Sequence, residues 1–394
     1  MKSNAIPMRE WLSLIGMTVS AFIFNTSEFM PIGLLTDIGH EFSLTEAQAG
    51  IMITAYAWVV AIFSLPFMLA VSKVGYRKLL LSTIAVFGIG QALSCVAPNY
   101  PLLVCARLVV AASHCIFWSI AAPIASQLVT KEHRPLAISM IATGTSIAVI
   151  FGLPLGRLIG IYLGWRITFL CVAVVTLLSF IYLWWIFPRL ATTKSFSLKE
   201  LPRLFHNKAL LGIYILTFLY ATSYYTGYSY IEPFLLQVAQ LSDDVVTIVL
   251  TIFGAAGLIG SFLCSKFYNH FRFKFIRVIM TSMAIALLLL YPAAGSVYTI
   301  IALCIFWGIA VMMYNVVFQA EVIQAVGVAS SAVAMSMYSG IFNLGIGSGT
   351  WLGGMVVTYG SLDYIGDVGG VLAIVAALFA MTFLIRELKR EKEA

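Results

Sequence analysis

The sequence predicts an all-α integral membrane protein, with twelve transmembrane helices arranged as two six-helix bundles. Composition is the first reason, because 61% of the 394 residues are hydrophobic, only 10% are charged and the mean hydropathy is +0.99. So little polar surface cannot cover a water-soluble globule of this length. The spacing of the apolar segments and the placement of the basic residues are the second and third reasons.

The apolar segments are separated by turn-forming or charged residues. Twelve spans of about 20 residues use about 240 residues and leave about 150 for connections, so no sizeable soluble domain fits. The spans are expected near residues 11–36, 48–71, 78–97, 101–127, 135–162, 166–187, 209–237, 244–266, 275–294, 297–322, 329–356 and 364–386.

The basic residues gather on one side of the predicted membrane. All of the 23 Lys and Arg residues except Arg107, Arg157 and Arg166 lie at the two ends of the chain or in alternate connections. The opposite connections carry acidic residues instead, namely Asp37, Glu41, Glu46, Asp243, Asp244, Asp363 and Asp367. This asymmetry predicts cytoplasmic termini and excludes nucleic acid as the partner that the +7 net charge would otherwise suggest.

The longest polar connection, residues 188–208, divides the helices into six and six. We expect an N-terminal bundle over 1–187, a cytoplasmic linker with a short interfacial helix over 197–204, and a C-terminal bundle over 209–394. The two halves resemble each other, because Glu28 in the first predicted helix corresponds to Glu232 in the seventh. Repeated halves of this kind predict transport by alternating access.

Glycines recur at intervals of four in the fifth and eleventh predicted helices, where they let two helices approach closely. They are Gly152, Gly156, Gly160 and Gly164 in the first half and Gly345, Gly349 and Gly353 in the second. Gly152, Pro154 and Gly156 also resemble part of a phosphate loop, but no Gly-Lys-Ser/Thr follows them. A helix kink with close packing is therefore expected there.

Four ionisable residues lie at membrane depth: Glu28, Arg107, His114 and Glu232. Each needs a partner or a water-lined cavity, because burial of a charge costs about 2.5 to 3.5 kcal/mol on insertion scales. From the helical rise, Glu28 and Arg107 lie roughly 12 and 9 Å below the outer membrane surface and can meet. Either Glu28 exchanges a proton beside Arg107, or the two form a fixed structural pair.

His114 shares a helical face with Arg107, Ala111 and Trp118, and that face is expected to line a cavity. Its imidazole can serve a substrate hydroxyl or a proton relay, or it can simply link two helices. Further rings and polar groups lie at cavity depth: Asn25, Tyr220, Tyr224, Tyr228, Glu232, Trp307, Tyr314, Asn315, Ser339 and Asn343. Rings beside hydroxyl and amide groups suit a sugar, although aromatic residues also face lipid and neighbouring helices. Glu232 can equally lie at the rim.

Several longer runs resemble the major facilitator superfamily, in particular its drug:proton antiporter branch and, within it, bacterial sugar efflux transporters. They are FIFNTSEFMPIGLL (22–35), ITAYAWVVAIFSLPFML (53–69), SHCIFWSI (113–120), IATGTSIAVIFGLPLGRLIG (141–160), YSYIEPF (228–234) and SGIFNLGIG (339–347). The resemblance implies the major facilitator fold with inverted repeats, and efflux as the direction of transport. It also implies that Arg107 belongs to the proton-coupling motif and that Gly152, Pro154 and Gly156 belong to the antiporter motif.

The sequence departs from this family's pattern in two places. The loop motif between the second and third helices lacks its usual acid, because Met68, Ser72, Lys73, Gly75, Tyr76 and Arg77 stand there. The gating salt bridge of that motif is therefore not expected. In the fourth-helix motif, Ala111 stands where the family usually has glycine, so the side chain at this position is still small.

We therefore expect a proton-coupled exporter of sugars or sugar-like glycosides, such as arabinose, in the bacterial inner membrane. An exporter of amphipathic drugs or other metabolites is the alternative within transport. Protons are the expected coupling ion, with no cofactor and no metal, and the protein is expected to act as a monomer in the lipid bilayer. An enzyme is disfavoured because no paired carboxylate, metal cluster or activated nucleophile is apparent, and a signalling sensor because no output domain is present. All six cysteines lie in apolar segments and are expected to be packing residues.

Overall fold

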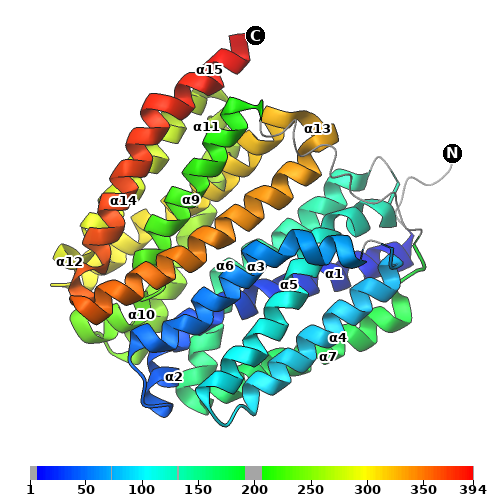
Figure 1. The fold of residues 1–394 in the computed structure, drawn as a ribbon, viewed down its shortest axis with the longest axis horizontal. Coiled ribbons are helices and arrows are strands. Elements are labelled where there is room, and N and C mark those ends of the chain that lie inside the picture. The colour runs from blue at the N-terminus through cyan, green and yellow to red at the C-terminus, as the bar shows by residue number, and fades with distance from the viewer. Residues whose placement is uncertain (1–6, 72, 131–132, 191–205, 394) are drawn as a thin grey trace. The chain divides into compact units, whose positions relative to one another are not determined.

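The computed structural model describes residues 7–71, 73–130, 133–190 and 206–393, and every regular element within these ranges is helical (Figure 1). The interfacial helix predicted over 197–204 lies outside the described residues. The chain forms two compact units. The first contains Met1–Leu34 and Ile62–Phe196, and the second contains Leu35–Ala61 and Ser197–Ala394.

The first unit is built from α1 and the helices of residues 62–196. Its elements are α1 (Met8–Phe29), the 3-10 turn η1 (Met30–Leu34), the end of α3 (Glu46–Val71), α4 (Tyr76–Cys95), α5 (Tyr100–Leu128), α6 (Arg134–Leu163) and α7 (Trp165–Ile186). The side chain of Asn99 begins α5 by accepting a hydrogen bond from the backbone N–H of Leu102 at 3.0 Å. Gly164, with φ of 89°, separates α6 from α7 in a conformation that favours glycine.

The second unit contains α2 (Leu35–Glu41), most of α3 and the helices after residue 206. Those helices are α9 (Lys208–Tyr228), α10 (Ile231–Pro233), the π-helix η4 (Phe234–Val238), α11 (Asp243–Leu288), α12 (Leu290–Ala293), α13 (Val297–Tyr359), η5 (Leu362–Tyr364), α14 (Ile365–Phe379), the π-helix η6 (Ala380–Leu384) and α15 (Ile385–Glu393).

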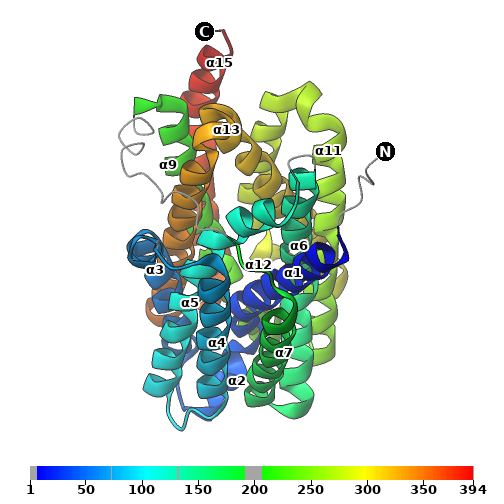
Figure 2. The same cartoon turned by 90° about the vertical axis from the view of Figure 1, so that its right-hand side faces the viewer.

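The twelve spans of the fold are present, although two pairs of them form continuous elements. Among the described residues, ten helical segments are long and apolar enough to cross a membrane. Straight helices of 46 and 63 residues, the lengths of α11 and α13, would extend about 70 and 95 Å, far more than a bilayer of about 30 Å. Instead α11 has a non-helical residue at Phe271 and turns back on itself (Figure 2), and α13 is also bent back (Figure 1). The second arms of α11 and α13 supply the remaining two spans.

Residues 35–61 group with the second unit, whereas the predicted division at the linker placed them in the N-terminal bundle. Polar contacts explain this grouping. Thr36 donates from its hydroxyl to Oε2 of Glu232 at 2.7 Å, and Gln237 donates to Oε1 of Glu46 at 2.6 Å. The division into six and six helices around residues 188–208 stays a prediction.

The repeated glycines allow close helix contact in both units. A Cβ atom on Gly152 would lie 2.8 Å from Oγ1 of Thr26, so α6 packs directly on α1. In the second unit, a Cβ on Gly345 would lie 2.5 Å from Cβ of Ala221, and one on Gly349 would strike the carbonyl oxygen of Thr222. The helices α13 and α9 therefore approach each other as α6 and α1 do.

Gly349→Ala should lower the melting temperature of the purified protein in detergent. The added methyl group meets a backbone carbonyl that cannot move aside as a side chain can, and overpacking typically costs about 1–3 kcal/mol. Gly295→Ala is the matched control, because nothing lies within 4 Å of the added Cβ. Equal melting temperatures for the two variants would contradict this packing.

Candidate functional site

Arg107 lies on α5 and is buried, with 2% of its surface exposed. Its Nη1 donates to Oγ of Ser27 at 3.0 Å, and its Nη2 donates to the carbonyl oxygen of Ser27 at 2.8 Å. The guanidinium carbon lies 5.6 Å from the ring centre of Phe169 on α7. The protein thus compensates a charge at membrane depth with two oxygen acceptors and an aromatic ring.

Ser27 connects three helices of the first unit. Besides the two hydrogen bonds from Arg107 on α5, its Oγ accepts one from Nε2 of Gln91 on α4. Both Ser27 and Gln91 are fully buried. Neither was among the sequence candidates. Gln91 carries a detectable signal, since a side-chain amide within a predicted spanning helix needs an internal partner.

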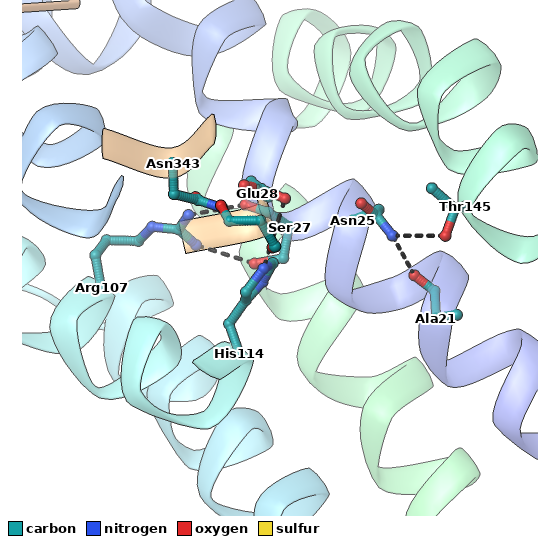
Figure 3. Close-up of polar contacts among 9 residues, drawn as sticks. Ala21, Asn25, Ser27, Glu28, Arg107, His114, Thr145 and Asn343 are labelled. Carbon is teal, nitrogen blue, oxygen red and sulfur yellow. Dashed lines mark hydrogen bonds and ion pairs between the residues drawn. The ribbon is translucent and has the colours of Figure 1, made fainter. Parts of the chain in front are cut away.

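Glu28, the next residue on α1, faces His114 of α5. Its Oε2 lies 3.8 Å from Nε2 of His114, and the two side chains are 10% and 3% exposed. Figure 3 shows Arg107 and His114 both pointing toward Ser27 and Glu28. A carboxylate, an imidazole and a fixed positive charge are therefore adjacent, an arrangement that can bind and pass on a proton.

The sequence predicted that Arg107 meets Glu28. In the structure Arg107 donates hydrogen bonds to Ser27, the residue before Glu28. Both hydrogen bonds described for Arg107 end on Ser27, while Glu28 faces His114. Helical rise determines the depth of each Cα atom, but it does not determine the direction of the side chains. Whether Glu28 exchanges a proton or belongs to a fixed structural pair stays a prediction.

Two other candidates of the first unit flank this group. Asn25, one turn before Glu28, points away toward α6 (Figure 3), where its Nδ2 donates to Oγ1 of Thr145 at 3.2 Å. Trp118 lies on the same side of α5 as His114, with 6.1 Å between the ring centres. Phe24 covers the histidine from α1 at 6.3 Å. Aromatic rings thus line the imidazole on two sides.

The second unit gathers three of the aromatic candidates into one cluster. The ring centres of Tyr224 and Tyr228 on α9 are 4.8 Å apart, and those of each tyrosine and Trp307 on α13 are 5.7 and 5.9 Å apart. Phe253 of α11 completes this ring cluster, 5.0 Å from Tyr228. The indole Nε1 of Trp307 donates to the sulfur of Met283 at 3.3 Å. Edge-to-face contacts of this kind hold the rings in defined orientations.

A second stack lies along α9 and α13. Tyr220 and Tyr314 are stacked with ring centres 3.4 Å apart, and the Tyr314 hydroxyl donates to Oγ1 of Thr217 at 3.0 Å. Two buried polar atoms of these helices, the Tyr220 hydroxyl and Oδ1 of Asn343, have no hydrogen-bond partner among the described residues. Buried polar groups are normally paired, so these two atoms are candidates for hydrogen bonds to a ligand.

The remaining candidates are held by local contacts. The amide nitrogens of Asn315 and Asn343 each donate to a carbonyl oxygen one turn earlier, at 3.0 Å to Val311 and 3.0 Å to Ser339. Glu232 lies in α10, beyond the end of α9, where Thr36 donates to it from both its backbone and its hydroxyl. The structure therefore places Glu232 among the contacts with α2.

A buried acid in the second unit was missed by the sequence analysis. Glu321 on α13 is fully buried; its Oε1 accepts from Nε of Arg272 at 2.6 Å and from the Tyr268 hydroxyl, and its Oε2 pairs with Nη2 of Arg272. Two parallel bonds from one guanidinium make a strong, directional pair. The sequence does contain a signal for Glu321, because it is an acidic residue close to the end of the apolar span predicted over 297–322. This pair ties α13 to α11 beside the bend at Phe271.

The cysteines and the possible metal ligands also bear on the sequence predictions. All six cysteines are free thiols, and within the described ranges no group of three or more His, Cys, Asp and Glu side chains could hold a metal ion. The absence of a cofactor stays a prediction.

The chain belongs to the major facilitator superfamily. The family model matches residues 17–334 and, in a second match, residues 233–394. The protein is therefore a multi-pass membrane transporter, and the twelve-helix, two-bundle fold class is confirmed.

Solved structures of similar fold support this assignment. The chain resembles a bacterial homologue of the human lysosomal transporter Spinster, solved in an inward-facing and unoccupied conformation, with a TM-score of 0.76 and 17% identity over 98% of each chain. The same homologue in an inward-facing and occupied conformation matches with a TM-score of 0.75 and 17% identity, over 97% of this chain and 99% of that one. At this level of identity the likeness concerns the fold.

Ser27→Ala should lower the melting temperature of the protein clearly more than Ser20→Ala. Loss of the Ser27 hydroxyl leaves a donor of Arg107 and one of Gln91 without their acceptor, and each unsatisfied buried group costs about 1–3 kcal/mol. Ser20 is the control because it is equally buried on α1 but its hydroxyl donates only to its own helix, to Gly16 at 2.8 Å. Equal losses would show that Ser27 does not organise the site.

Proposed function

We propose that this transporter exports sugars or sugar-like glycosides from the bacterial cytoplasm in exchange for protons, by alternating access between its two halves. Family membership supports transport across a membrane. The direction and the coupling rest on the resemblance to sugar efflux transporters carried by motifs such as residues 22–35 and 141–160. In this proposal both termini are cytoplasmic and the working unit is a monomer in the inner membrane.

The observation that carries the proposal is the buried carboxyl group of Glu28 facing His114 beside Arg107. Ionisation of a carboxyl group at membrane depth is costly, and a nearby guanidinium offsets part of that cost. Such a group can be neutral in one conformation of the carrier and ionised in the other. Protonation then biases the equilibrium between the two conformations, which is what coupling requires.

The choice of a sugar rests on the ring cluster and the two unpaired polar atoms of the second unit. A sugar presents apolar faces, which suit the rings of Tyr224, Tyr228 and Trp307, and hydroxyl edges, which can pair with Tyr220 and Asn343. His114 and Trp118 of the first unit stay predicted substrate contacts. Each restored hydrogen bond to a buried group contributes about 0.5–1.5 kcal/mol to binding.

An exporter of amphipathic drugs is the second candidate. The contiguous rings of Tyr224, Tyr228, Phe253 and Trp307 favour it, since flat apolar molecules bind to aromatic rings through buried area alone. The two candidates differ in the role of the two unpaired polar atoms, which matter for a sugar and not for an apolar drug.

Cells that carry the chain should accumulate several-fold less labelled arabinose than matched cells that lack it, because the carrier returns the sugar to the medium. An uncoupler that collapses the proton gradient should abolish the difference. Accumulation can be measured by rapid filtration with and without the uncoupler.

Equal accumulation in both strains would contradict sugar export. A difference that persists in the presence of the uncoupler would contradict proton coupling. Export of a fluorescent drug that excess arabinose does not inhibit would favour the second candidate.

A further inference from the structure

A surface groove in the second unit lies between α11 and α13, and none of its lining residues belongs to the ring cluster. Its volume is about 490 Å³, within the range of about 300–1,000 Å³ for ligand pockets. The floor is buried and includes Ser282, Ala310 and Met313, while Val278 and Phe306 on its walls are 52% and 37% exposed. The groove therefore opens at the exterior of apolar helices, which in a membrane transporter contact the acyl chains of the bilayer.

The groove has one charged end. Lys274 is its single charged lining residue among those described, and the Nζ atom lies 5.3 Å from the ring centre of Phe271, at the bend of α11. From Lys274 to Ser282 the groove follows α11 for eight residues, or about 12 Å. The other described lining residues apart from Ser282 are apolar. A molecule with an anionic head group and an apolar tail about 12 Å long matches this pattern.

The charge around the bend favours an anion. The connecting segment from Lys266 to Arg277 holds four Lys and Arg residues and no acid. Arg272 is engaged by Glu321, whereas Arg277 is exposed one turn after Lys274 on the same face of α11. Basic residues next to a spanning helix attract anionic lipid headgroups.

We propose that this groove binds an anionic phospholipid of the surrounding bilayer leaflet. Its phosphate lies at Lys274 and Arg277, and one acyl chain follows α11 from Phe271 toward Ser282. The lipid is a stabilising ligand of the bend, where the Arg272–Glu321 pair joins α11 to α13, and is not the transported substrate. The proposal does not depend on which solute the transporter carries.

The test uses the purified full chain in detergent, to which phosphatidylglycerol or phosphatidylcholine with identical acyl chains is added. Native mass spectrometry counts bound lipids, and thermal unfolding measures stabilisation. Phosphatidylglycerol should bind and raise the melting temperature more than phosphatidylcholine. Short-chain phosphatidylglycerol should bind more weakly, and inorganic phosphate should not stabilise the protein.

Lys274→Gln should weaken phosphatidylglycerol binding about five-fold, the equivalent of about 1 kcal/mol for one basic side chain near the membrane surface. Lys266→Gln is the control, because it removes the same charge from the same segment but Lys266 lies against Phe262 and Phe267, outside the groove. Both substitutions alter an exposed side chain, so folding is preserved.

Three results would overturn the proposal. Equal binding of phosphatidylglycerol and phosphatidylcholine would show that the groove holds any lipid through apolar contact alone. Stabilisation by inorganic phosphate would indicate an anion site without a lipid. Equal effects of the two lysine substitutions would place the lipid elsewhere on the basic segment.

Discussion

The hydrogen bonds from Arg107 to Ser27 are the interaction on which the first unit's site depends. A guanidinium in a spanning helix has no water to solvate it, so α1 must present oxygen atoms at the right depth. Ser27 supplies both a hydroxyl and a carbonyl, and Gln91 fixes that hydroxyl from α4. Glu28 is the next residue, so the same contacts determine where its carboxyl group meets His114.

Close helix packing makes this arrangement possible. Because Gly152 has no side chain, α6 reaches the backbone of α1 beside Thr26, one residue before Ser27. Gly345 and Gly349 do the same between α13 and α9 in the second unit, next to the tyrosines of α9. In each half, a helix with glycines therefore packs closely on the first helix of that half, α1 or α9. The first helix carries an acid in α1 and aromatic rings in α9.

The sequence predicted the helical class, the spans and the glycine stripes because these follow from periodicity and composition. It also singled out Glu28, Arg107 and His114, since ionisable residues are rare at membrane depth. Ser27 was missed because serines are common in spanning helices and nothing in the sequence distinguishes Ser27 from Ser20. Glu321 was missed because its partner Arg272 lies 49 residues away, across a bend whose geometry only the fold determines. The grouping of residues 35–61 likewise depends on contacts, such as Thr36 with Glu232, that no local pattern contains.

The central claim, that Glu28 couples protons to solute, is tested most directly by proton movement that a sugar gradient drives. Proteoliposomes loaded with arabinose and a pH-sensitive dye are diluted into sugar-free buffer of equal pH. The account predicts that the lumen acidifies as sugar leaves through the unmodified protein or the Glu232→Gln control, and that Glu28→Gln abolishes this acidification. Sugar efflux through the unmodified protein without a pH change, or undiminished acidification with Glu28→Gln, would contradict it.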